Sequence, residues 1–537
     1  MQHVTVVGAG VAGMAAALRL LERGVPVTIL EQDDFLGGKL GAHRHGAGAG
    51  DFHEHSYHMY LNWYANFWRI IDEVGLSDRF APQSSIPYLR PREADRPQRA
   101  VEMRDVGAPE TALHNLLSGL RRPSDMFLYG YSLIDLLSEP EWSGRLERLS
   151  VLGYMAQRGY NTGGAISIQQ DVLAKAFASP SWLTSARSYQ RFIGFGYQSP
   201  SPSMWLMRGN TEEHLFGPLR AHMEAVAARA GVAFEVRRLH RVEALHLNTA
   251  GAVERLTVQR LAESPSVDAG KCDVVVETLT HRLEGPLILA IPHGPLGRLV
   301  SEEVYARAPA LADVRRLQSQ PMASLDIYFR RRLPGVPAGI VNLIGSEHGL
   351  SFLDLSQAWT LSDMPNTVLN VVASDLVPIA RYADPTIARI MIEGLHRYLD
   401  FDEADIEHER THVNTNVGEA LFTNQVGSWN LRPTTECAIP NLFLAGDFCR
   451  NPIDVVTIEG ATVSGLMAAE AVRRRLGAGG PVDIVLPPEL PKATLAAMEL
   501  AGAPSAYAAK AYSVAEGWAM DFWRETFPRG MRQAWRW

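Results

Sequence analysis

Three glycines close to the start of the chain have the spacing of a phosphate-binding turn. Gly8, Gly10 and Gly13 follow the apolar run HVTVVG and precede the apolar run MAAALRLLERG. Glycine at these positions permits a tight turn, lets the backbone approach a pyrophosphate and allows a helix to pack close to a sheet. Unpaired N–H groups at the start of that helix would attract the phosphates. The pattern predicts a dinucleotide-binding site.

An acidic residue and a second glycine pair extend this prediction. Glu31 ends the next apolar run, VPVTILE, where a carboxylate would accept hydrogen bonds from the hydroxyls of an adenosine ribose. Gly37 and Gly38 come next and are followed by Lys39. We expect the backbone of this pair to pass close to the phosphates, with the Lys39 ammonium nearby as a cation.

A histidine and a glutamate four residues apart are the candidates for proton transfer. His58 can accept or donate a proton because an imidazole titrates near neutral pH, and Glu54 would orient its ring. A purely structural role for the pair is the alternative. Other histidines crowd the same stretch: His43, His45, His53 and His55. We expect these to be packing or solvent-facing residues and no metal site, because GAGAG at 46–50 is a flexible connection and helical ligand spacing is missing.

The elements that must position these residues predict an α/β fold. We expect a Rossmann-type domain built from three separated segments, and an α+β substrate domain with a mixed or antiparallel sheet and a helical cap. The dinucleotide-binding domain is expected to span 1–85, 206–300 and 416–480, the substrate domain 86–205 and 301–415, and a helical aromatic tail 481–537.

Several runs define individual strands. FEVRRLHRVEALHL alternates as a strand does, and GPLILAIP and NLFLAGD are typical of buried strands. SLDIYFRRRL and NTVLNVVASD alternate like strands of a half-exposed antiparallel sheet in the substrate domain.

Length and composition limit the classes of protein to consider. A chain of 537 residues is too long for one ordinary core, and a net charge of −8 gives no sign of a nucleic-acid partner. The three cysteines, Cys272, Cys437 and Cys449, are scattered, which fits a reducing compartment. The chain starts on its first strand and has no long charge-free apolar run. We therefore expect no signal peptide, no transmembrane helix and a cytoplasmic location.

The end of the chain combines aromatic residues with arginines. A peripheral contact with a membrane surface is one interpretation, because this mixture suits the interface. A tail docked on its own domain or on a partner subunit of an oligomer is the other, and acidic residues that interrupt the basic face favour it. The aromatic residues are Trp518, Phe522, Trp523, Phe527, Trp535 and Trp537.

Together these motifs resemble the flavin-containing amine oxidase and phytoene desaturase superfamily, and the N-terminus is more similar to the phytoene desaturase side. GGKLGAHRH and GDFHEHSYHMYLNWYANFWRIIDEVG are similar to the desaturase run from Gly-Gly-Lys through an acid-x-x-x-His motif (Glu54, His58) and a Tyr-x-Asn motif (Tyr64, Asn66). Near the other end, LRPTTECAIPNLFLAGDF and IEGATVSGLMAAEAV resemble the Arg-Pro, Ala-Gly-Asp and Glu-Gly-Ala blocks of the superfamily.

The resemblance implies FAD as the cofactor and assigns further residues to it. Gly446 and Asp447 would meet the pyrophosphate–ribityl region, and the backbone of Val242 would contact the adenine. Glu459, Gly460 and Ala461 would place a helix N-terminus under the flavin pyrimidine, which stabilises the negative charge of reduced flavin. His58 would lie near the flavin edge. His293 would touch cofactor or substrate, or else cap a strand end, and Arg432 would pack on the cofactor side.

Three kinds of chemistry remain open for such a flavoprotein. The first is hydride removal that desaturates or dehydrogenates a hydrophobic, terpenoid-like or carotenoid-like substrate, with oxygen or a quinone as possible electron acceptor. The second is amine oxidation, although the lysine that many amine oxidases carry late in the substrate domain is absent between Lys271 and Lys492. The third is redox-neutral isomerisation. Aromatic residues of the helical insertion would line an apolar tunnel or fill a core: Trp142, Tyr154, Tyr160, Trp182, Tyr189, Phe192, Phe195, Tyr197 and Trp205.

Overall fold

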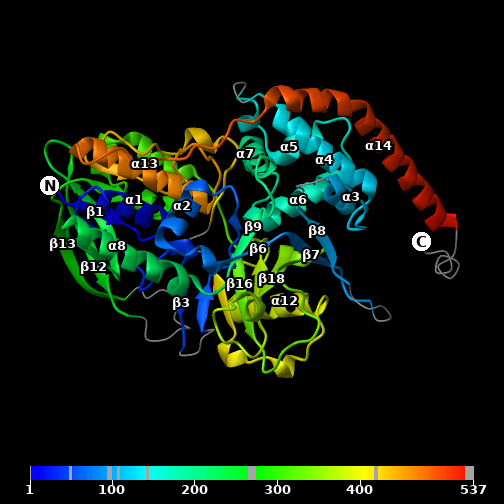
Figure 1. Ribbon diagram of the computed structural model, residues 1–537, viewed down its shortest axis with the longest axis horizontal. Helices are drawn as coiled ribbons and strands as arrows, with labels where there is room; N and C mark the ends of the chain where they lie inside the picture. Colours follow the sequence, from blue (N-terminus) through cyan, green and yellow to red (C-terminus); the bar gives the residue numbers. More distant parts are fainter. Residues whose placement is uncertain are drawn as a thin grey trace.

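A computed structural model describes residues 2–46, 51–93, 99–105, 109–140, 144–263, 274–416 and 421–526. Two sheets, each covered by helices, lie side by side in Figure 1, one next to the N-terminus and the other below a group of helices. The predicted fold class, a Rossmann-type α/β domain joined to an α+β domain, is confirmed.

The first sheet has five parallel strands in the order β10-β2-β1-β14-β22. It draws on distant parts of the chain, since its strands are β1 (Val4–Val7), β2 (Val27–Leu30), β10 (Phe234–Arg237), β14 (Leu287–Leu289) and β22 (Leu442–Leu444). Alternate residues of a strand point to opposite faces, so Val4 and Val6 enter one core and Val7 another.

Helices cover one face of this sheet and a small antiparallel sheet covers the other. The helices are α1 (Val11–Leu21), α2 (Ala65–Val74), α8 (Gly217–Ala230) and α13 (Ile458–Leu476), and α1 packs on α13 and α8 (Figure 1). The covering sheet is formed by β11 (His240–Leu247), β12 (Val253–Leu261) and β13 (Val275–Arg282).

One strand expected from the sequence is divided in two. FEVRRLHRVEALHL forms β10 in the parallel sheet and then β11 in the antiparallel one. Leu239 between them has a left-handed backbone with φ of 59°, which breaks the extended run. Hydrogen bonds from Leu239 N to Asp33 O (3.2 Å) and from His240 N to Glu31 O (2.7 Å) hold the break against the end of β2.

The second sheet has seven strands in the order β20-β16-β19-β18-β17-β7-β8, antiparallel except for the pair β17 and β7. They are β7 (Ser85–Leu89), β8 (Val101–Arg104), β16 (Ala323–Tyr328), β17 (Ile340–Leu343), β18 (Leu350–Asp354), β19 (Val368–Ala373) and β20 (His412–Thr415). The expectation of half-exposed strands is wrong for β16 and β19, because every residue of both is buried. Helix α12 (Asp384–His396) covers one face with Ile387, Met391 and Leu395.

Five helices form a cap beside the second sheet, and a long sixth helix lies along them (Figure 1). The five are α3 (Pro109–Leu117), α4 (Pro123–Ser138), α5 (Val151–Ala156), α6 (Gly163–Phe177) and α7 (Ala186–Tyr197). The sixth, α14 (Lys492–Thr526), packs on α4, where the Tyr131 hydroxyl donates to Glu499 O at 2.9 Å and Ala506 is fully buried. Its far end extends away from the cap in Figure 1.

Smaller elements connect these layers. They are β3 (Ala42–Arg44), β4 (Phe52–Glu54), β5 (Tyr60–Leu61), β6 (Phe80–Gln83), β9 (Met204–Met207), α9 (His293–Leu299), α10 (Glu302–Arg307), β15 (Ser319–Gln320), α11 (Leu355–Ala358) and β21 (Leu421–Phe422). Across the residues that the structure describes, no helix is long and apolar enough to cross a membrane.

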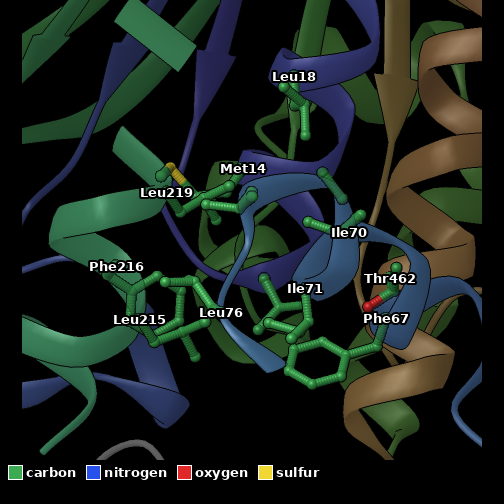
Figure 2. A pocket seen from close by; sticks show the side chains of 13 residues that line it. Met14, Leu18, Phe67, Ile70, Ile71, Leu76, Leu215, Phe216, Leu219 and Thr462 are labelled. Carbon is green, nitrogen blue, oxygen red and sulfur yellow. The ribbon is translucent and has the colours of Figure 1, made fainter. Parts of the chain in front are cut away.

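A small void lies in the core between α1, α2 and α8. Figure 2 shows Met14, Ile71 and Leu219 among the apolar side chains around it, and its volume is about 20 Å³. A space of this size with an apolar lining is a packing gap rather than a ligand site.

Candidate active site

A cavity of about 1890 Å³ lies between the two sheets. Small-molecule pockets usually have roughly 300–1,000 Å³, so this cavity has room for a dinucleotide and a second molecule. The glycine motif lines it, and so do side chains of the substrate domain, both apolar (Ile86, Val172, Met204, Met322 and Val372) and polar or charged (Lys175, Ser374, Arg389, His408 and Asn416).

Most residues assigned to the cofactor from the sequence meet in this cavity. The lining includes Gly8, Gly10, Glu31, Gly37, Gly38, Lys39, Val242, Gly446, Asp447 and Ala461. Gly13, Glu459 and Gly460 do not contribute to the described lining, and their surroundings explain why.

The glycine turn has a distinct reason for each glycine. Gly8 has φ of 101°, and a Cβ on it would lie 2.5 Å from Ala290 O. A Cβ on Gly13 would lie 2.0 Å from Gly8 O, so only glycine at this position lets the helix backbone approach the turn this closely. Gly10 has no such restriction, because a Cβ there would have Gly37 O at 3.9 Å as its nearest neighbour. Gly10 therefore leaves open space on the cavity side, which is the cradle that a pyrophosphate needs.

Glu31 is fixed at the edge of the cavity by the backbone. Its Oε2 accepts a hydrogen bond from Ala9 N at 2.6 Å, and its Oε1 accepts one from Asp33 N at 3.0 Å. A carboxylate has about four acceptor positions, so it can bind further donors such as ribose hydroxyls while these bonds persist. The geometry fits the predicted role of Glu31.

The second glycine pair lies against the first. Gly37 N donates to Ala9 O at 2.9 Å, and Gly37 has φ of 100° with the Phe216 ring 2.3 Å from where a Cβ would be. A side chain at Gly37 would therefore displace Phe216. This packing brings Lys39 to the wall of the same cavity.

Arg432 organises the loop that carries Asp447. Its guanidinium is fully buried, pairs with Asp454, and donates to Phe448 O (2.9 Å) and Cys449 O (2.8 Å). Burial raises the pKa of the Asp454 carboxyl, although the charge of Arg432 opposes that shift. Arg432 thus acts on the cofactor side through the backbone of this loop.

Replacing Arg432 by alanine is expected to lower the free energy of unfolding by about 3–5 kcal/mol, because buried Asp454 would keep only Arg187, at 3.2 Å, as an ion-pair partner and the carbonyl oxygens of Phe448 and Cys449 would lose their donor. Urea denaturation followed by circular dichroism measures the loss. Arg450→Ala is the matched control, since Arg450 only donates to backbone oxygens of Trp429 and Asn430 in the described chain. Equal losses in the two variants would show that the buried ion pair is unimportant.

Glu459 faces away from the cavity. Its Oε1 accepts from Asn66 N (2.9 Å) and Asn66 Nδ2 (2.6 Å), and its Oε2 accepts from Phe67 N (3.0 Å). The two backbone donors belong to the first turn of α2 and the third donor is the Asn66 side-chain amide, so Glu459 caps that helix from another element. Burial raises the pKa of this carboxyl, and the three donors oppose the shift. A role at the flavin remains a prediction for the backbone of Glu459 alone.

Helix α13 begins beside the cavity. The Thr457 hydroxyl accepts from Gly460 N at 3.1 Å and caps the helix. A Cβ on Gly460 would lie 2.5 Å from Val455 O, so glycine permits the sharp entry into the helix. Ile458 and Ala461 of this first turn line the cavity.

His58 and Glu54 lie together, and the His58 ring lines the cavity. His58 Nδ1 is 3.6 Å from Glu54 Oε2, and both side chains are largely buried. Glu54 Oε1 accepts from Thr211 N at 3.1 Å, which fixes the carboxylate. The structure thus brings the predicted pair together at a place where its imidazole can meet a ligand.

A second histidine in this wall has a buried acidic partner that the sequence analysis missed. His53 Nδ1 bonds to a carboxylate oxygen of Asp326, and the other oxygen of Asp326 accepts from Asn370 Nδ2 at 2.6 Å. His53 also lines the cavity, which corrects the expectation that it is only a packing residue. The signal in the sequence is an acid inside the apolar run SLDIYF, since a buried acid requires a partner.

His293 lies behind the cavity wall rather than in it. Its Nε2 is 2.9 Å from the Ser319 hydroxyl, and its ring packs on Phe422 and Phe448. Burial lowers its pKa to about 4, and the charge of Lys39 adds to the shift. His293 is therefore a neutral packing residue at neutral pH.

The aromatic residues of the helical insertion do not form a tunnel. Phe192 lines the cavity, whereas Tyr154, Tyr160 and Tyr189 are buried in cap cores and Phe195 is buried against Ile453, Val455 and Val463. The remaining ones are exposed (Trp182, Tyr197), packed on the first core (Trp205) or outside the described residues (Trp142). Of the described members of this set, Phe192 alone lines the cavity, and most of the others fill cores, which is the second of the two roles expected from the sequence.

A Rossmann-type domain whose glycine cradle opens into a cavity shared with a second domain defines a dinucleotide-dependent enzyme. The chain belongs to the flavin containing amine oxidoreductase family, which it matches over residues 11–473. It is a flavin-containing oxidoreductase, and its cofactor is FAD.

The relatives include carotenoid desaturases and, by fold, amine oxidases. The chain is 21% identical to a probable zeta-carotene desaturase of Synechococcus elongatus (88% of this chain, 98% of the relative) and 21% identical to a 15-cis-phytoene desaturase of Capsicum annuum (88% and 77%). Its fold is similar to a putrescine oxidase variant (TM-score 0.62, 13% identity, 88% of this chain and 99% of that one). It is also similar to cyclohexylamine oxidase from Brevibacterium oxydans (TM-score 0.58, 13% identity, 89% and 99%).

Proposed function

We propose that the enzyme desaturates a lipophilic, terpenoid-like or carotenoid-like substrate. The observation that carries this proposal is the continuity of one large cavity from the glycine cradle to a group of apolar side chains in the substrate domain, Ile86, Val172, Met204, Met322 and Val372. The desaturases among the relatives support the same substrate class.

Desaturation removes two hydrogens from neighbouring carbons, and FAD held by the glycine cradle would supply the acceptor for the one that leaves as hydride. The other leaves as a proton while the new double bond forms. We assign the proton to the cavity-facing side of His58, because its Nδ1 faces Glu54 and the negative carboxylate stabilises the imidazolium. The apolar side chains of the substrate domain hold the substrate and exclude water.

Amine oxidation is the second candidate, favoured by the similarity of the fold to two amine oxidases. Against it stands the absence of lysine between Lys271 and Lys492.

Stoichiometry separates oxidation from redox-neutral isomerisation. A desaturase consumes one two-electron acceptor for each double bond, so we expect product and reduced acceptor in equal amounts with oxygen or a quinone. Product formation in the absence of any acceptor would contradict the proposal. The same assay identifies which of the two acceptors supports turnover.

A lipophilic substrate also suggests access from a membrane surface, for which α14 is the candidate contact. Leu500, Tyr512 and Trp518 are exposed on it, and Trp518 is 74% accessible. Side chains of Phe522 and Trp523, and all of Phe527, Trp535 and Trp537, lie outside what the structure describes.

Deleting residues 518–537 is expected to reduce binding to liposomes and to leave the fold intact. The cut lies beyond Ser513, which is still buried in the α4 interface. Sedimentation with vesicles measures binding, and thermal unfolding controls for stability. Unchanged vesicle binding and unchanged turnover of lipophilic substrate would remove the membrane contact from the account.

A further inference from the structure

A lysine projects into the part of the cavity that belongs to the substrate domain. Lys175 lies on the last turns of α6 and lines the cavity together with Val172 and Ala176 of the same helix and Ile86 of β7. These neighbours are aliphatic. A cation in such a wall requires an explanation, because taking a charge out of water costs free energy unless a partner offsets it.

The described protein supplies Lys175 with few partners. Its Nζ donates one hydrogen bond, to Leu343 O at 3.1 Å, and lies 5.6 Å from the centre of the Tyr88 ring. Asp171, one turn earlier on α6, pairs instead with Arg121. No carboxylate within the described ranges lies at ion-pair distance from Lys175. An ammonium has three N–H donors, so two remain for a ligand.

The electrostatics agree with this geometry. Burial lowers the pKa of Lys175 to about 8, an effect that Asp171 opposes and Arg121 reinforces. The group is therefore still mostly protonated at neutral pH. A bound anion would stabilise the charged form and recover part of the desolvation cost.

Lys175 and the proposed proton acceptor lie over different strands of the second sheet. Tyr57, next to His58, donates its backbone N–H to Asn370 Oδ1 on β19 at 3.0 Å, and its hydroxyl lies 2.6 Å from the Ser351 hydroxyl on β18. Lys175 donates to Leu343 O at the end of β17. A substrate that contacts both Lys175 and His58 therefore extends across more than one strand of the sheet.

We propose that Lys175 binds a carboxylate at one end of the substrate, so that the enzyme acts on an elongated lipophilic acid rather than on a pure hydrocarbon. This inference rests on the proposed desaturase function and names the substrate class for the same cavity. The apolar body of the acid lies along the aliphatic wall, and its reacting carbons lie near His58. The carboxylate completes the hydrogen bonds of the ammonium as a charge-assisted pair.

The test compares all-trans-retinoate with its methyl ester, two polyenes of the same length that differ in the charge of the end group. Dissociation constants are measured on the oxidised, FAD-loaded enzyme by quenching of tryptophan fluorescence. The wild type is expected to bind the acid at least tenfold more tightly than the ester, which corresponds to about 1.4 kcal/mol. Lys175→Met is expected to abolish this preference by weakening binding of the acid, with binding of the ester unchanged.

Controls separate charge from folding. Lys175→Met is expected to melt no lower than wild type, because it removes a poorly compensated cation from an apolar wall. Lys175→Arg should keep a preference for the acid. Lys510→Met removes the same charge from α14, outside the cavity, and should change neither dissociation constant.

Two results would overturn the inference: equal affinity of the wild type for acid and ester, or an unchanged preference in Lys175→Met. Either result can occur while hydrocarbon polyenes still reduce the flavin. In that case the proposed desaturase function is retained and the proposal of an acidic substrate is rejected. If no lipophilic compound reduces the flavin, the desaturase function fails, and the binding constants still report on Lys175 directly.

Discussion

Replacing Gly10 with valine is expected to give a folded, colourless protein that has lost at least about 100-fold in affinity for FAD, or roughly 2.8 kcal/mol. The backbone at Gly10 is extended, with φ of −70° and ψ of 177°, which valine adopts readily. Nothing in the described protein lies closer than 3.9 Å to an added Cβ. The side chain would therefore occupy the space reserved for the pyrophosphate. Flavin absorbance per protein and titration with FAD measure the loss.

Gly13→Ala is the matched comparison, because it places a methyl group 2.0 Å from Gly8 O and outside the described cavity lining. This variant should lose folding stability, whereas Gly10→Val should keep the melting temperature of the wild-type apoprotein. A yellow Gly10→Val protein with normal FAD content would contradict the assignment of the cradle.

Replacing His58 with glutamine is expected to lower kcat by roughly 10²–10⁴-fold while FAD content stays unchanged. Glutamine fills similar space and can still hydrogen-bond, but it accepts no proton at neutral pH. Rapid mixing with substrate under anaerobic conditions measures the rate of flavin reduction.

Neighbouring residues provide controls for His58. The His55 ring is 5.0 Å from the His58 ring and also lines the cavity, so His55→Gln tests for general disturbance of the wall. Glu54→Gln removes the charge that faces His58 and should reduce the rate by less than His58→Gln does. Near-normal turnover in His58→Gln would assign the pair a structural role.

The cofactor end of the site is predictable from the sequence because its geometry is local. Gly8, Gly10 and Gly13 act within one turn, and Glu31 follows on the next strand, so their spacing in the chain determines their spacing in space. The division of FEVRRLHRVEALHL into two strands was not predictable from the sequence. The left-handed backbone of Leu239 that divides them is stabilised by hydrogen bonds to residues just after β2, which are distant in the chain.

The substrate end depends on contacts between distant parts of the chain. Asp326 reaches His53 across 273 positions and Asn370 across 44, and neither pairing leaves a local pattern. In the sequence Lys175 has no feature that distinguishes it from other helical lysines. Its contacts with Leu343 O and the Tyr88 ring come from distant parts of the chain and appear only in the structure. Glu459 matches a cofactor block in sequence, yet its carboxylate caps α2, since the N-terminus of that helix offers the nearest unsatisfied N–H groups.

The most direct test of the account is anaerobic flavin reduction. The FAD-loaded enzyme is mixed without oxygen with lipophilic polyenes and terpenoids, including polyenoic acids, and separately with amines, and the visible flavin absorbance is followed. We predict bleaching by a lipophilic polyene, with formation of one new double bond for each flavin reduced, and no bleaching by amines. Bleaching by amines alone would contradict the account, and so would conversion of a polyene to an isomer while the flavin stays oxidised.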